Sequence, residues 1–338
     1  MVFCFGELLL RISPAANGIW IKNAQFPVYV GGAELNVATA LARWGQATRY
    51  CTALPDNSMA ADIIAYIESI GIDSSAIHHS GERIGTYYLP QGADLKTTSV
   101  IYDRAGSSFS LLRPGMLDWD ELLDGCHWFH FSAISPALTE HVAALCLEGI
   151  TAAVNKGLKI SVDLNYRAKL WQYGRQPREV MPPLVEHCDL IMGNIWAADT
   201  MLGTGLNQEL IEGRNREWFI SHGAWTARNI GKLFPKCRSV ANTFRFDNQD
   251  GLTYYTTLHH EGEEYVSPEF STDSVEDRIG SGDCFMAGLI YGFSSAHPPQ
   301  EIIDFSAAAA FGKLREKGDA TRQTVDMVQK TLKQYGQR

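Results

Sequence analysis

Residues 275–292 read VEDRIGSGDCFMAGLIYG, a glycine-rich turn that runs directly into an apolar stretch. Gly280 and Gly282 carry no side chain, so the backbone there can approach another group closely. Residues 284–293 have helical spacing, which places the turn at the N-terminus of a predicted helix. Backbone N–H groups at a helix N-terminus attract anions. The stretch therefore predicts an anion-binding turn.

Asp283 ends this turn, directly after Gly280, Ser281 and Gly282. A carboxylate beside a bound phosphate can accept the proton of a hydroxyl group that attacks the phosphorus. The alternative is a purely structural turn in which Asp283 only caps the helix. The motif is too short to decide between the two.

A second helix led by glycines occurs near the start of the chain, where residues 31–45 read GGAELNVATALARWG. Segments of strand and helix character alternate around it and along most of the chain. This alternation predicts an α/β fold with a mostly parallel central sheet flanked by helices. We expect strands at 2–10, 47–53, 76–78, 128–133, 158–165, 189–194, 217–223, 239–246 and 252–259, and helices at 59–69, 178–187, 284–294 and 302–317.

Two segments depart from the alternation, at about 12–30 and 85–112. The second contains IGTYYLP and TTSVIYDR, two strand-like runs separated by the turn-like residues 91–94. Runs of this kind predict a β-hairpin. We expect the two segments to form a small β-sheet of their own within a single domain that spans 1–338.

The overall composition excludes several classes of protein. The 338 residues include 29 Lys and Arg against 38 Asp and Glu, a net charge of −9 that argues against nucleic acid as a partner. No apolar run reaches the ~18 residues of a membrane span. The N-terminus lacks the basic segment and cleavage site of a secretion signal. Seven scattered cysteines without a CxxC pair favour a reduced, cytoplasmic protein.

Together, the two glycine-led stretches resemble the signatures of the ribokinase-like (PfkB) carbohydrate kinase family. GGAELNVATALARWG resembles the N-terminal signature, and EDRIGSGDCFMAGLIYG resembles the C-terminal one, usually written DTxGAGD. The resemblance covers essentially the whole chain. It implies an ATP-dependent kinase that uses Mg²⁺, with the small sheet as a lid and a homodimer formed through that lid.

The resemblance also implies roles within the glycine-rich turn. Asp283 would be the catalytic base, and Gly280, Ser281 and Gly282 would bind the transferred phosphate. Ser281 stands where the family usually has Ala, and Arg278 stands where it usually has Thr. Arg278 would lie near the nucleotide phosphates or would simply be solvated.

Substrate contacts are implied at the first signature and in the lid. Gly31, Gly32 and Asn36 would approach sugar hydroxyl groups, since an amide both donates and accepts hydrogen bonds. Tyr102 and Arg104 occupy alternate positions of one lid strand and so face the same side.

Tyr87 lies on the partner strand, and Arg167 follows a buried strand, where parallel-sheet proteins place their sites. A guanidinium group suits a carboxylate, so two arginines at one pocket favour an acidic sugar.

This set resembles the 2-keto-3-deoxygluconate kinases, which use a Tyr-x-Arg on the lid and an Asn-Tyr-Arg after a central strand. The resemblance favours 2-keto-3-deoxygluconate as the substrate, phosphorylated at its primary hydroxyl. If Arg104 and Arg167 are instead surface residues or ion-pair partners, a fructokinase or ribokinase activity on a neutral sugar is the alternative. A nucleoside kinase and a non-catalytic sugar- or nucleotide-binding homologue also stay open.

The nucleotide and metal sites are marked less clearly. The family motif Asn-x-x-Glu begins here at Asn194, but Ala197 replaces the expected Glu, and Asp199 is the nearby carboxylate. Mg²⁺ would then be held through Asp199 or mainly by the nucleotide. For the nucleotide we expect a loop at Gly223 and a small-residue surface at 307–312, where tight helix packing is the alternative reading.

Overall fold

The structure is a computed structural model that describes residues 1–14, 25–90, 100–206, 215–248 and 251–336. Its elements in chain order are β1 (Val2–Phe5), β2 (Leu9–Ile12), β3 (Val28–Gly31), α1 (Ala33–Arg43), β4 (Thr48–Leu54), α2 (Ser58–Ser69), β5 (Ile77–His79), β6 (Gly85–Tyr88), β7 (Ile101–Asp103), η1 (Phe109–Leu111), α3 (Trp119–Leu122), β8 (Trp128–Ser132), α4 (Glu140–Asn155), β9 (Lys159–Asp163), α5 (Pro177–Val185), β10 (Leu190–Gly193), α6 (Ile195–Leu202), α7 (Arg216–Leu233), β11 (Ser239–Asn248), β12 (Gly251–His260), β13 (Glu263–Val266), β14 (Phe270–Thr272), α8 (Ser281–Ser294), α9 (Pro299–Lys313) and α10 (Val325–Tyr335).

The large sheet has the strand order β13-β12-β11-β10-β9-β8-β1-β4-β5, and β14 pairs with β12 at its edge. All pairs from β5 to β11 are parallel, and β12 adds antiparallel pairs with β11, β13 and β14. The central strands are buried on both faces, which their near-continuous apolar sequences require. The predicted mostly parallel sheet is confirmed.

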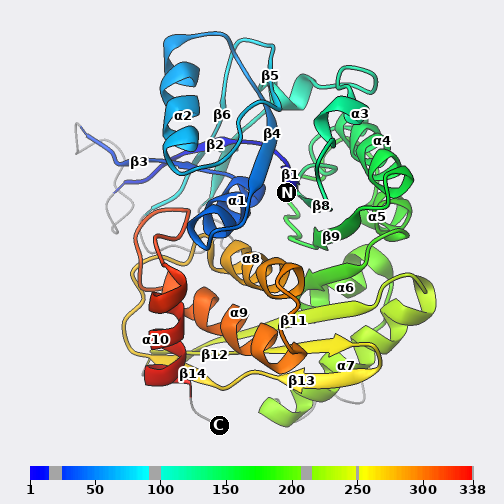
Figure 1. The fold of residues 1–338 in the computed structure, drawn as a ribbon, viewed down its shortest axis with the longest axis vertical. Helices are drawn as coiled ribbons and strands as arrows, with labels where there is room; N and C mark the ends of the chain where they lie inside the picture. Colours follow the sequence, from blue (N-terminus) through cyan, green and yellow to red (C-terminus); the bar gives the residue numbers. More distant parts are fainter. Residues whose placement is uncertain (15–24, 91–99, 207–214, 249–250, 337–338) are drawn as a thin grey trace.

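Helices cover both faces of this sheet (Figure 1). One layer packs side chains from α1, α2, α8, α9 and α10 against the strands. The other packs α3 to α7 against the opposite face. The site-bearing helices α1 and α8 therefore share one face of the sheet and lie in contact with each other.

The small sheet has the order β3-β2-β6-β7 and lies apart from the large one (Figure 1). Strand β6 pairs antiparallel with β7, as the hairpin prediction requires, while its turn at 91–94 falls outside the described residues. The small sheet already begins at Leu9, and Phe109 and Leu112 pack into the main core instead. The lid segments are thus shifted from the expected bounds of 12–30 and 85–112.

Three expected elements differ in the structure. The strand expected at 2–10 is divided into β1 and β2, because the chain leaves the large sheet after Phe5 and enters the small one at Leu9. The strand expected at 217–223 is wrong: helix α7 begins there, capped by the Asn215 side chain, which accepts a hydrogen bond from Trp218 N. Helix α9 ends at Lys313 rather than at residue 317.

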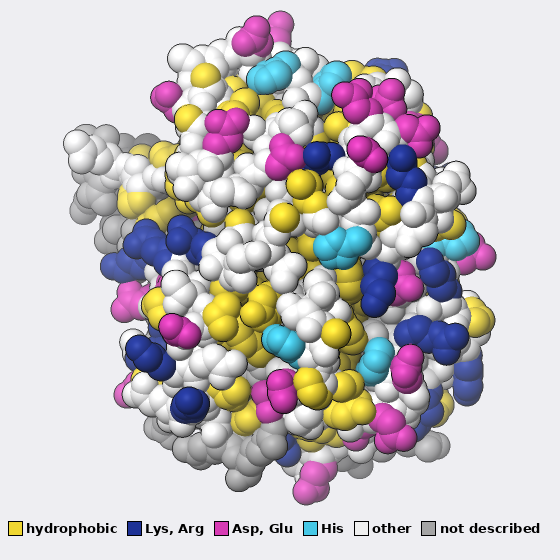
Figure 2. All heavy atoms as spheres, in the orientation of Figure 1, with side chains coloured by type: hydrophobic (Ala, Val, Ile, Leu, Met, Phe, Trp, Pro, Cys, Tyr) yellow, Lys and Arg dark blue, Asp and Glu magenta, His cyan; other side chains and the backbone are white. Residues whose placement is uncertain are grey.

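On the face shown in Figure 2, basic and acidic side chains are interspersed rather than gathered into one field. None of the described helices is both long enough and apolar enough to cross a bilayer.

Candidate active site

A cavity of about 190 Å³ lies where the two sheets face each other. Its wall includes the carboxyl ends of β9 and β10, residues of β11, the N-termini of α1 and α8, and the lid strands β6 and β7. Ligands in open parallel sheets bind at the carboxyl ends of the strands, and this cavity has that position. Among the lining residues are Gly32, Asn36, Tyr87, Tyr102, Arg104, Asp163, Arg167, Asn194, Arg245, Arg278, Gly280, Ser281, Gly282, Asp283 and Asp319.

The glycine-rich turn forms one wall of this cavity. Gly280 has a φ of 77°, in the left-handed region that favours glycine, and helix α8 begins directly after it. A Cβ atom at Gly280 would overlap the carbonyl oxygen of Asp319, so close packing also requires glycine. No side chain caps α8, which leaves its first backbone N–H groups available beside the cavity. The turn therefore has the local structure of an anion-binding site.

Asp283 connects the two signature stretches. Its Oδ2 accepts a hydrogen bond of 2.7 Å from Asn36 Nδ2, although the residues lie 247 positions apart. Burial raises the pKa of Asp283 to about 6, while the Asn36 hydrogen bond and the charge of Arg167 oppose the rise. The Oδ1 atom of Asn36 is buried and has no partner among the described residues, so it can accept from a ligand.

Gly32 shapes the floor beside Asn36. Its φ of 137° and the backbone oxygen of Glu7, which a Cβ atom would overlap, leave room only for glycine. Helix α1 begins at the next residue without a side-chain cap, like α8.

Asp163 and Glu34 are two further buried carboxylates at or beside the site, and the sequence reasoning missed both, as it missed Asp319 in the cavity lining. Asp163 ends β9 and lines the cavity, and burial together with the charge of Asp283 raises its pKa. Glu34 accepts hydrogen bonds from the backbone and hydroxyl of Ser132, and burial raises its pKa to about 7. A signal for Asp163 was present, since an acidic residue that ends a buried strand lies at the ligand edge of a parallel sheet.

Arg104 reaches the cavity but is already paired. Its Nε donates to Glu7 Oε2 at 2.6 Å, and the side chain of Ser107 donates to the other oxygen of the same carboxylate. Both ionised side chains are almost fully buried. This pairing fixes the direction of the guanidinium group and partly compensates its charge. Glu7 was not identified from the sequence, because it lies in the stretch expected to continue a strand.

Arg167 is differently placed. It lines the cavity and donates to the backbone oxygen of Tyr166 at 3.0 Å. Its Nε is buried without a hydrogen-bond partner, and no carboxylate forms an ion pair with it among the residues that the structure describes. A half-buried guanidinium with unused donors can bind an anionic group. The charge of Arg167 is therefore more available to a ligand than that of Arg104.

The two predicted tyrosines come together on the lid. Tyr87 and Tyr102 are direct partners on β6 and β7, with ring centroids 6.4 Å apart. The hydroxyl of Tyr87 donates to Asp319 at 2.6 Å, and Arg104 lies 5.9 Å from the ring centroid of Tyr102. Both tyrosines line the cavity from the two neighbouring lid strands.

Three predicted site residues lie outside the cavity lining. Gly31 packs against the side chain of Asp319. Asp199 accepts from the backbone of Gly205 and faces Arg178 instead of the cavity. The loop expected at Gly223 is wrong, because Gly223 is buried in the middle of helix α7.

Asn194 and two further arginines also line the cavity. The side chain of Asn194 caps α6 by accepting a hydrogen bond from Ala197 N. Arg245 lies on β11 in the same wall and was not identified from the sequence. Arg278 also lines the cavity and forms an ion pair of 2.5 Å with Asp247, so it is neither simply solvated nor unpaired.

The small-residue stretch at 307–312 is buried in helix α9 and packs tightly against α8, whose Gly288 leaves no room for a Cβ beside Ser306. Helix packing therefore accounts for this stretch, as the alternative reading held.

The side chains present fit a divalent metal only in part. Over the described ranges, no group of three or more His, Cys, Asp or Glu side chains is arranged to hold a metal ion. Mg²⁺ is commonly bound through one or two carboxylates together with substrate phosphates. Asp163 in the cavity wall suits that limited role, whereas Asp199 does not.

Comparison with known proteins adds an independent result. Residues 1–324 match the pfkB family carbohydrate kinase pattern. A 2-dehydro-3-deoxygalactonokinase of Haloferax volcanii is 28% identical over 336 residues, which cover 97% of this chain and 95% of that protein. A 5-dehydro-2-deoxygluconokinase of Geobacillus thermodenitrificans is 26% identical over 86% of this chain and 79% of its own. The crystal structure of a 2-dehydro-3-deoxygluconokinase from Thermotoga maritima matches with a TM-score of 0.88 and 31% identity, covering 98% of each chain.

Proposed function

The chain belongs to the pfkB family of carbohydrate kinases, and on that premise we propose that it transfers the γ-phosphate of ATP to the primary hydroxyl of a sugar acid. The favoured substrate is 2-keto-3-deoxygluconate or a close relative of it. One observation carries the proposal. Asp283, at the head of α8, is hydrogen-bonded to Asn36 of the other signature in a cavity that Arg167 also lines.

Asp283 acts as the general base. Its carboxylate accepts the proton of the primary hydroxyl while the hydroxyl oxygen forms a bond to the γ-phosphorus, and the bond to the leaving ADP oxygen breaks. A positioned base of this kind contributes about 10²–10⁴-fold to a rate. Asn36 orients Asp283 through one end of its amide and offers the other end to a sugar hydroxyl.

The backbone N–H groups of Ser281, Gly282 and Asp283 stabilise the charge that develops on the transferred phosphoryl group. Arg245 and Arg278 line the same cavity and can compensate the phosphate charges of the nucleotide. Bound Mg²⁺ would neutralise β- and γ-phosphate oxygens, held mainly by the nucleotide with Asp163 as the protein ligand.

Arg167 supports an acidic acceptor. The Nε atom of Arg167 is buried without a hydrogen-bond partner, which is costly unless an anion or another acceptor satisfies it. A substrate carboxylate satisfies it with charge-assisted hydrogen bonds, whereas the hydroxyl groups of a neutral sugar provide weaker ones. The names of the three relatives agree with an acidic substrate, because two of them refer to 3-deoxy sugar acids and the third to a 2-deoxy sugar acid.

A neutral-sugar kinase is the second candidate, and one observation favours it. Glu7 already pairs with Arg104, so only Arg167 of the two predicted arginines lacks an ion pair among the described residues. A neutral sugar would accept hydrogen bonds from Arg104 without displacing Glu7.

A coupled assay of ADP release tests the proposal and separates the candidates. The panel comprises 2-keto-3-deoxygluconate, 2-keto-3-deoxygalactonate, gluconate, fructose, ribose and adenosine. We expect kcat/KM for the keto-deoxy acids to exceed that for fructose by about 10²-fold or more, as two charge-assisted hydrogen bonds allow. A preference for fructose would overturn the sugar-acid assignment and retain the kinase. No sugar-dependent ADP release from any compound would favour a non-catalytic homologue.

Arg167→Met is the matched variant for that assay. Loss of charge-assisted hydrogen bonds worth about 1.5–3 kcal/mol should raise KM for the acid about 10–100-fold. The rate with a neutral sugar should change little. Arg43→Met, an exposed arginine on α1, serves as the control and should leave both substrates unaffected.

A further inference from the structure

A buried lysine lies behind the glycine-rich turn. Lys313 is the last residue of α9, and its side chain has 0% exposure to solvent. A Cβ atom at Gly280 would lie 3.3 Å from Lys313 Cε, so the lysine packs directly against the turn. Lys313 does not line the cavity, so it contacts the turn without being part of the cavity wall.

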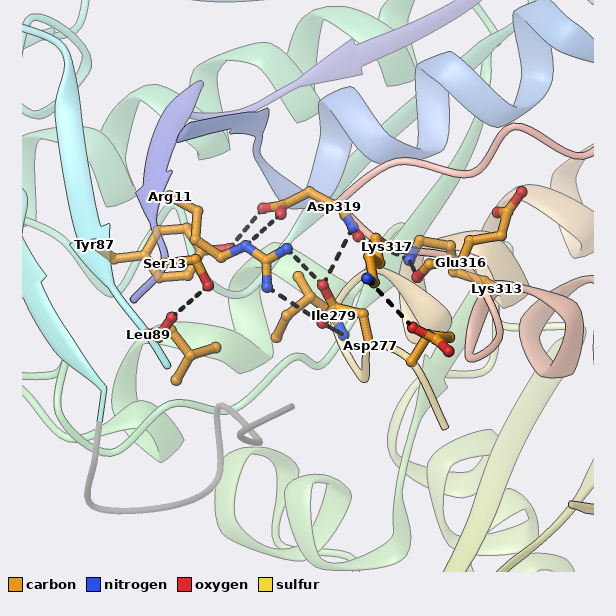
Figure 3. Close-up of polar contacts among 12 residues, drawn as sticks. Arg11, Ser13, Tyr87, Leu89, Asp277, Ile279, Lys313, Glu316, Lys317 and Asp319 are labelled. Atoms are coloured by element: carbon orange, nitrogen blue, oxygen red, sulfur yellow. Dashed lines mark hydrogen bonds and ion pairs between the residues drawn. The ribbon is translucent and has the colours of Figure 1, made fainter. Parts of the chain in front are cut away.

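The ammonium group is held by backbone oxygens. Lys313 Nζ donates to the carbonyl of Gly318 at 2.8 Å and to the carbonyl of Glu316 at 3.1 Å (Figure 3). Both carbonyls belong to the loop that follows directly after α9. The early end of this helix, at Lys313 rather than residue 317, is what brings them around the ammonium group.

The surrounding charges balance. Arg11 forms ion pairs with Asp277 at 2.6 Å and with Asp319 at 2.8 Å (Figure 3). With Lys313 the cluster contains two cations and two carboxylates, all buried. Burial lowers the pKa of Lys313, and Asp277, Glu316 and Asp319 oppose that effect. Removing a buried cation from such a cluster leaves a carboxylate without a compensating charge, which strongly destabilises the folded state.

The same cluster fixes the turn in place. The Asp277 carboxylate accepts from the backbone N–H of Gly318 at 3.2 Å and from that of Ile279 at 3.2 Å. The carbonyl oxygen of Asp319 packs against Gly280. The loop around the ammonium group therefore contacts both ends of the Asp277–Gly280 segment, through the Asp277 carboxylate at one end and against Gly280 at the other.

We propose that Lys313 is a positioning residue for phosphoryl transfer: its ammonium group is a built-in monovalent cation that holds the 314–319 loop against the anion-binding turn. The proposal rests on the kinase function proposed above. The two carbonyl oxygens around Nζ form a partial cage that can accept another monovalent cation of similar size. Without the lysine side chain, a free ammonium ion fits the vacated position, and potassium fits because carbonyl oxygens can replace its hydration shell.

Chemical rescue of Lys313→Ala tests this proposal. Rates of the full chain are measured in sodium, potassium, ammonium and tetramethylammonium chloride at one ionic strength. We expect kcat to fall about 10²-fold in sodium or tetramethylammonium, the size of effect seen when a fixed electrostatic group is lost. Ammonium and potassium should restore at least a tenth of the rate, saturably, with little change in KM for the sugar.

Lys317→Ala is the matched control, because Lys317 lies in the same loop but its side chain is 68% exposed. The wild type and Lys317→Ala should show equal rates in all four salts, since their cage is filled. A Lys313→Ala variant that keeps the wild-type rate in sodium would overturn the proposal. So would a loss of rate that neither ammonium nor potassium reverses.

A thermal unfolding series provides a readout that does not depend on activity. Ammonium or potassium should raise the unfolding midpoint of Lys313→Ala relative to tetramethylammonium, because an ion bound only to the folded state stabilises it. The midpoints of the wild type and of Lys313→Met, whose side chain still fills the cage, should not respond. Equal midpoints for Lys313→Ala in all salts would count against the cage. If the wild type transfers no phosphate, the kinase function fails while this series still tests the cage.

Discussion

Asp283 carries a conflict between chemistry and stability. As a base it must be ionised, yet the structure buries it and raises its pKa from 3.8 to about 6. The Asn36 hydrogen bond and the charge of Arg167 limit the rise without cancelling it. Burial therefore favours the neutral acid, and the ionised form that predominates above about pH 6 is obtained at a cost to folding.

Replacing Asp283 by Asn should stabilise the protein at neutral pH. The unfolded carboxylic acid loses its proton near pH 3.8 and the folded one near pH 6, so wild-type stability declines as pH rises between these values. The amide of the variant has no charge to bury and avoids this decline. We expect a gain of up to about 3 kcal/mol at pH 8 and none below pH 4.

Urea unfolding at pH 4 and pH 8 measures this gain. Asp62→Asn on the exposed face of α2 is the control and should show no such difference. An Asp283→Asn variant that is less stable than the wild type at pH 8 would contradict the proposed ionisation of the site.

The same pKa predicts the acidic limb of the pH–rate profile. For transfer to the sugar, kcat/KM at saturating ATP should rise with pH and level off above an inflection near 6, since only ionised Asp283 can accept a proton. Asn36→Ala should move this inflection to higher pH, because the Asn36 hydrogen bond favours the ionised form. An inflection that stays in place in Asn36→Ala would belong to another group, such as the nucleotide.

At this scale, the family resemblance brought together residues that lie far apart in the chain. Asn36, Tyr87, Tyr102 and Arg167 all line the cavity with Asp283, as the resemblance implied. Ion-pair partners could not be predicted in the same way. Glu7 and Arg104 are 97 positions apart, and only the packing of the lid against the end of β1 brings them together.

At the scale of elements, the lid is joined to the glycine-rich turn by strand β2. Arg11 on β2 holds Asp277 with two hydrogen bonds, and Tyr87 on β6 donates to Asp319 in the same cluster. Asp277 lies three positions before Gly280. The position of the lid and the position of the turn are thus linked through one buried ion-pair cluster.

The substitution Arg11→Met should therefore lower the free energy of unfolding. It leaves Asp277 and Asp319 buried with one cation fewer, which typically destabilises a protein by about 3–5 kcal/mol. Arg83→Met is the control: Arg83 also pairs on the lid, with Asp103, but both side chains are more than a third exposed. Its loss should cost less than about 1 kcal/mol. Equal effects of the two variants in urea unfolding would argue against a link between lid and turn.

The errors among the predicted elements have physical causes. Residues 217–223 contain Trp, Phe and Ile, which favour strands, but Asn215 caps a helix whose buried face continues to Ile230. Helix α9 was expected to continue to residue 317, but it ends at Lys313, whose ammonium group contacts carbonyls of the loop that follows. Local composition indicates neither the Asn215 cap nor this lysine contact.

At the scale of the whole molecule, the sequence predicted the architecture because two signatures far apart in the chain require each other. Helices α1 and α8 carry these signatures and pack together on one face of the sheet. The alternation of strands and helices along the chain then predicted the parallel sheet. The exit of the chain from β1 into the lid was not predicted, because Gly6 to Leu8 are as buried as the strands on either side.

We expect the protein to form a dimer through the outer face of the lid. Ile12, Val28, Tyr88 and Ile101 are consecutive partners across the four strands. They alternate with the cavity-facing residues and so point away from the site. Val28 and Ile101 are 56% and 54% exposed, and a second copy of the sheet would bury them.

Sedimentation at micromolar concentration tests this expectation. Val28→Lys combined with Ile101→Lys should yield monomers, while Met59→Lys, at an equally exposed position on α2, should remain dimeric. A monomeric wild-type protein would contradict the expected dimer and leave the kinase proposal untouched.

The most direct test of the central proposal is product formation from ATP and 2-keto-3-deoxygluconate by the wild type and by Asp283→Asn. The wild type should release one ADP for each sugar phosphate, with the new ester at the primary hydroxyl by phosphorus NMR. Asp283→Asn should bind the sugar with largely unchanged affinity but turn over about 10²–10⁴-fold more slowly. Turnover by Asp283→Asn at the wild-type rate, or a wild type that forms no sugar phosphate, would contradict the proposal.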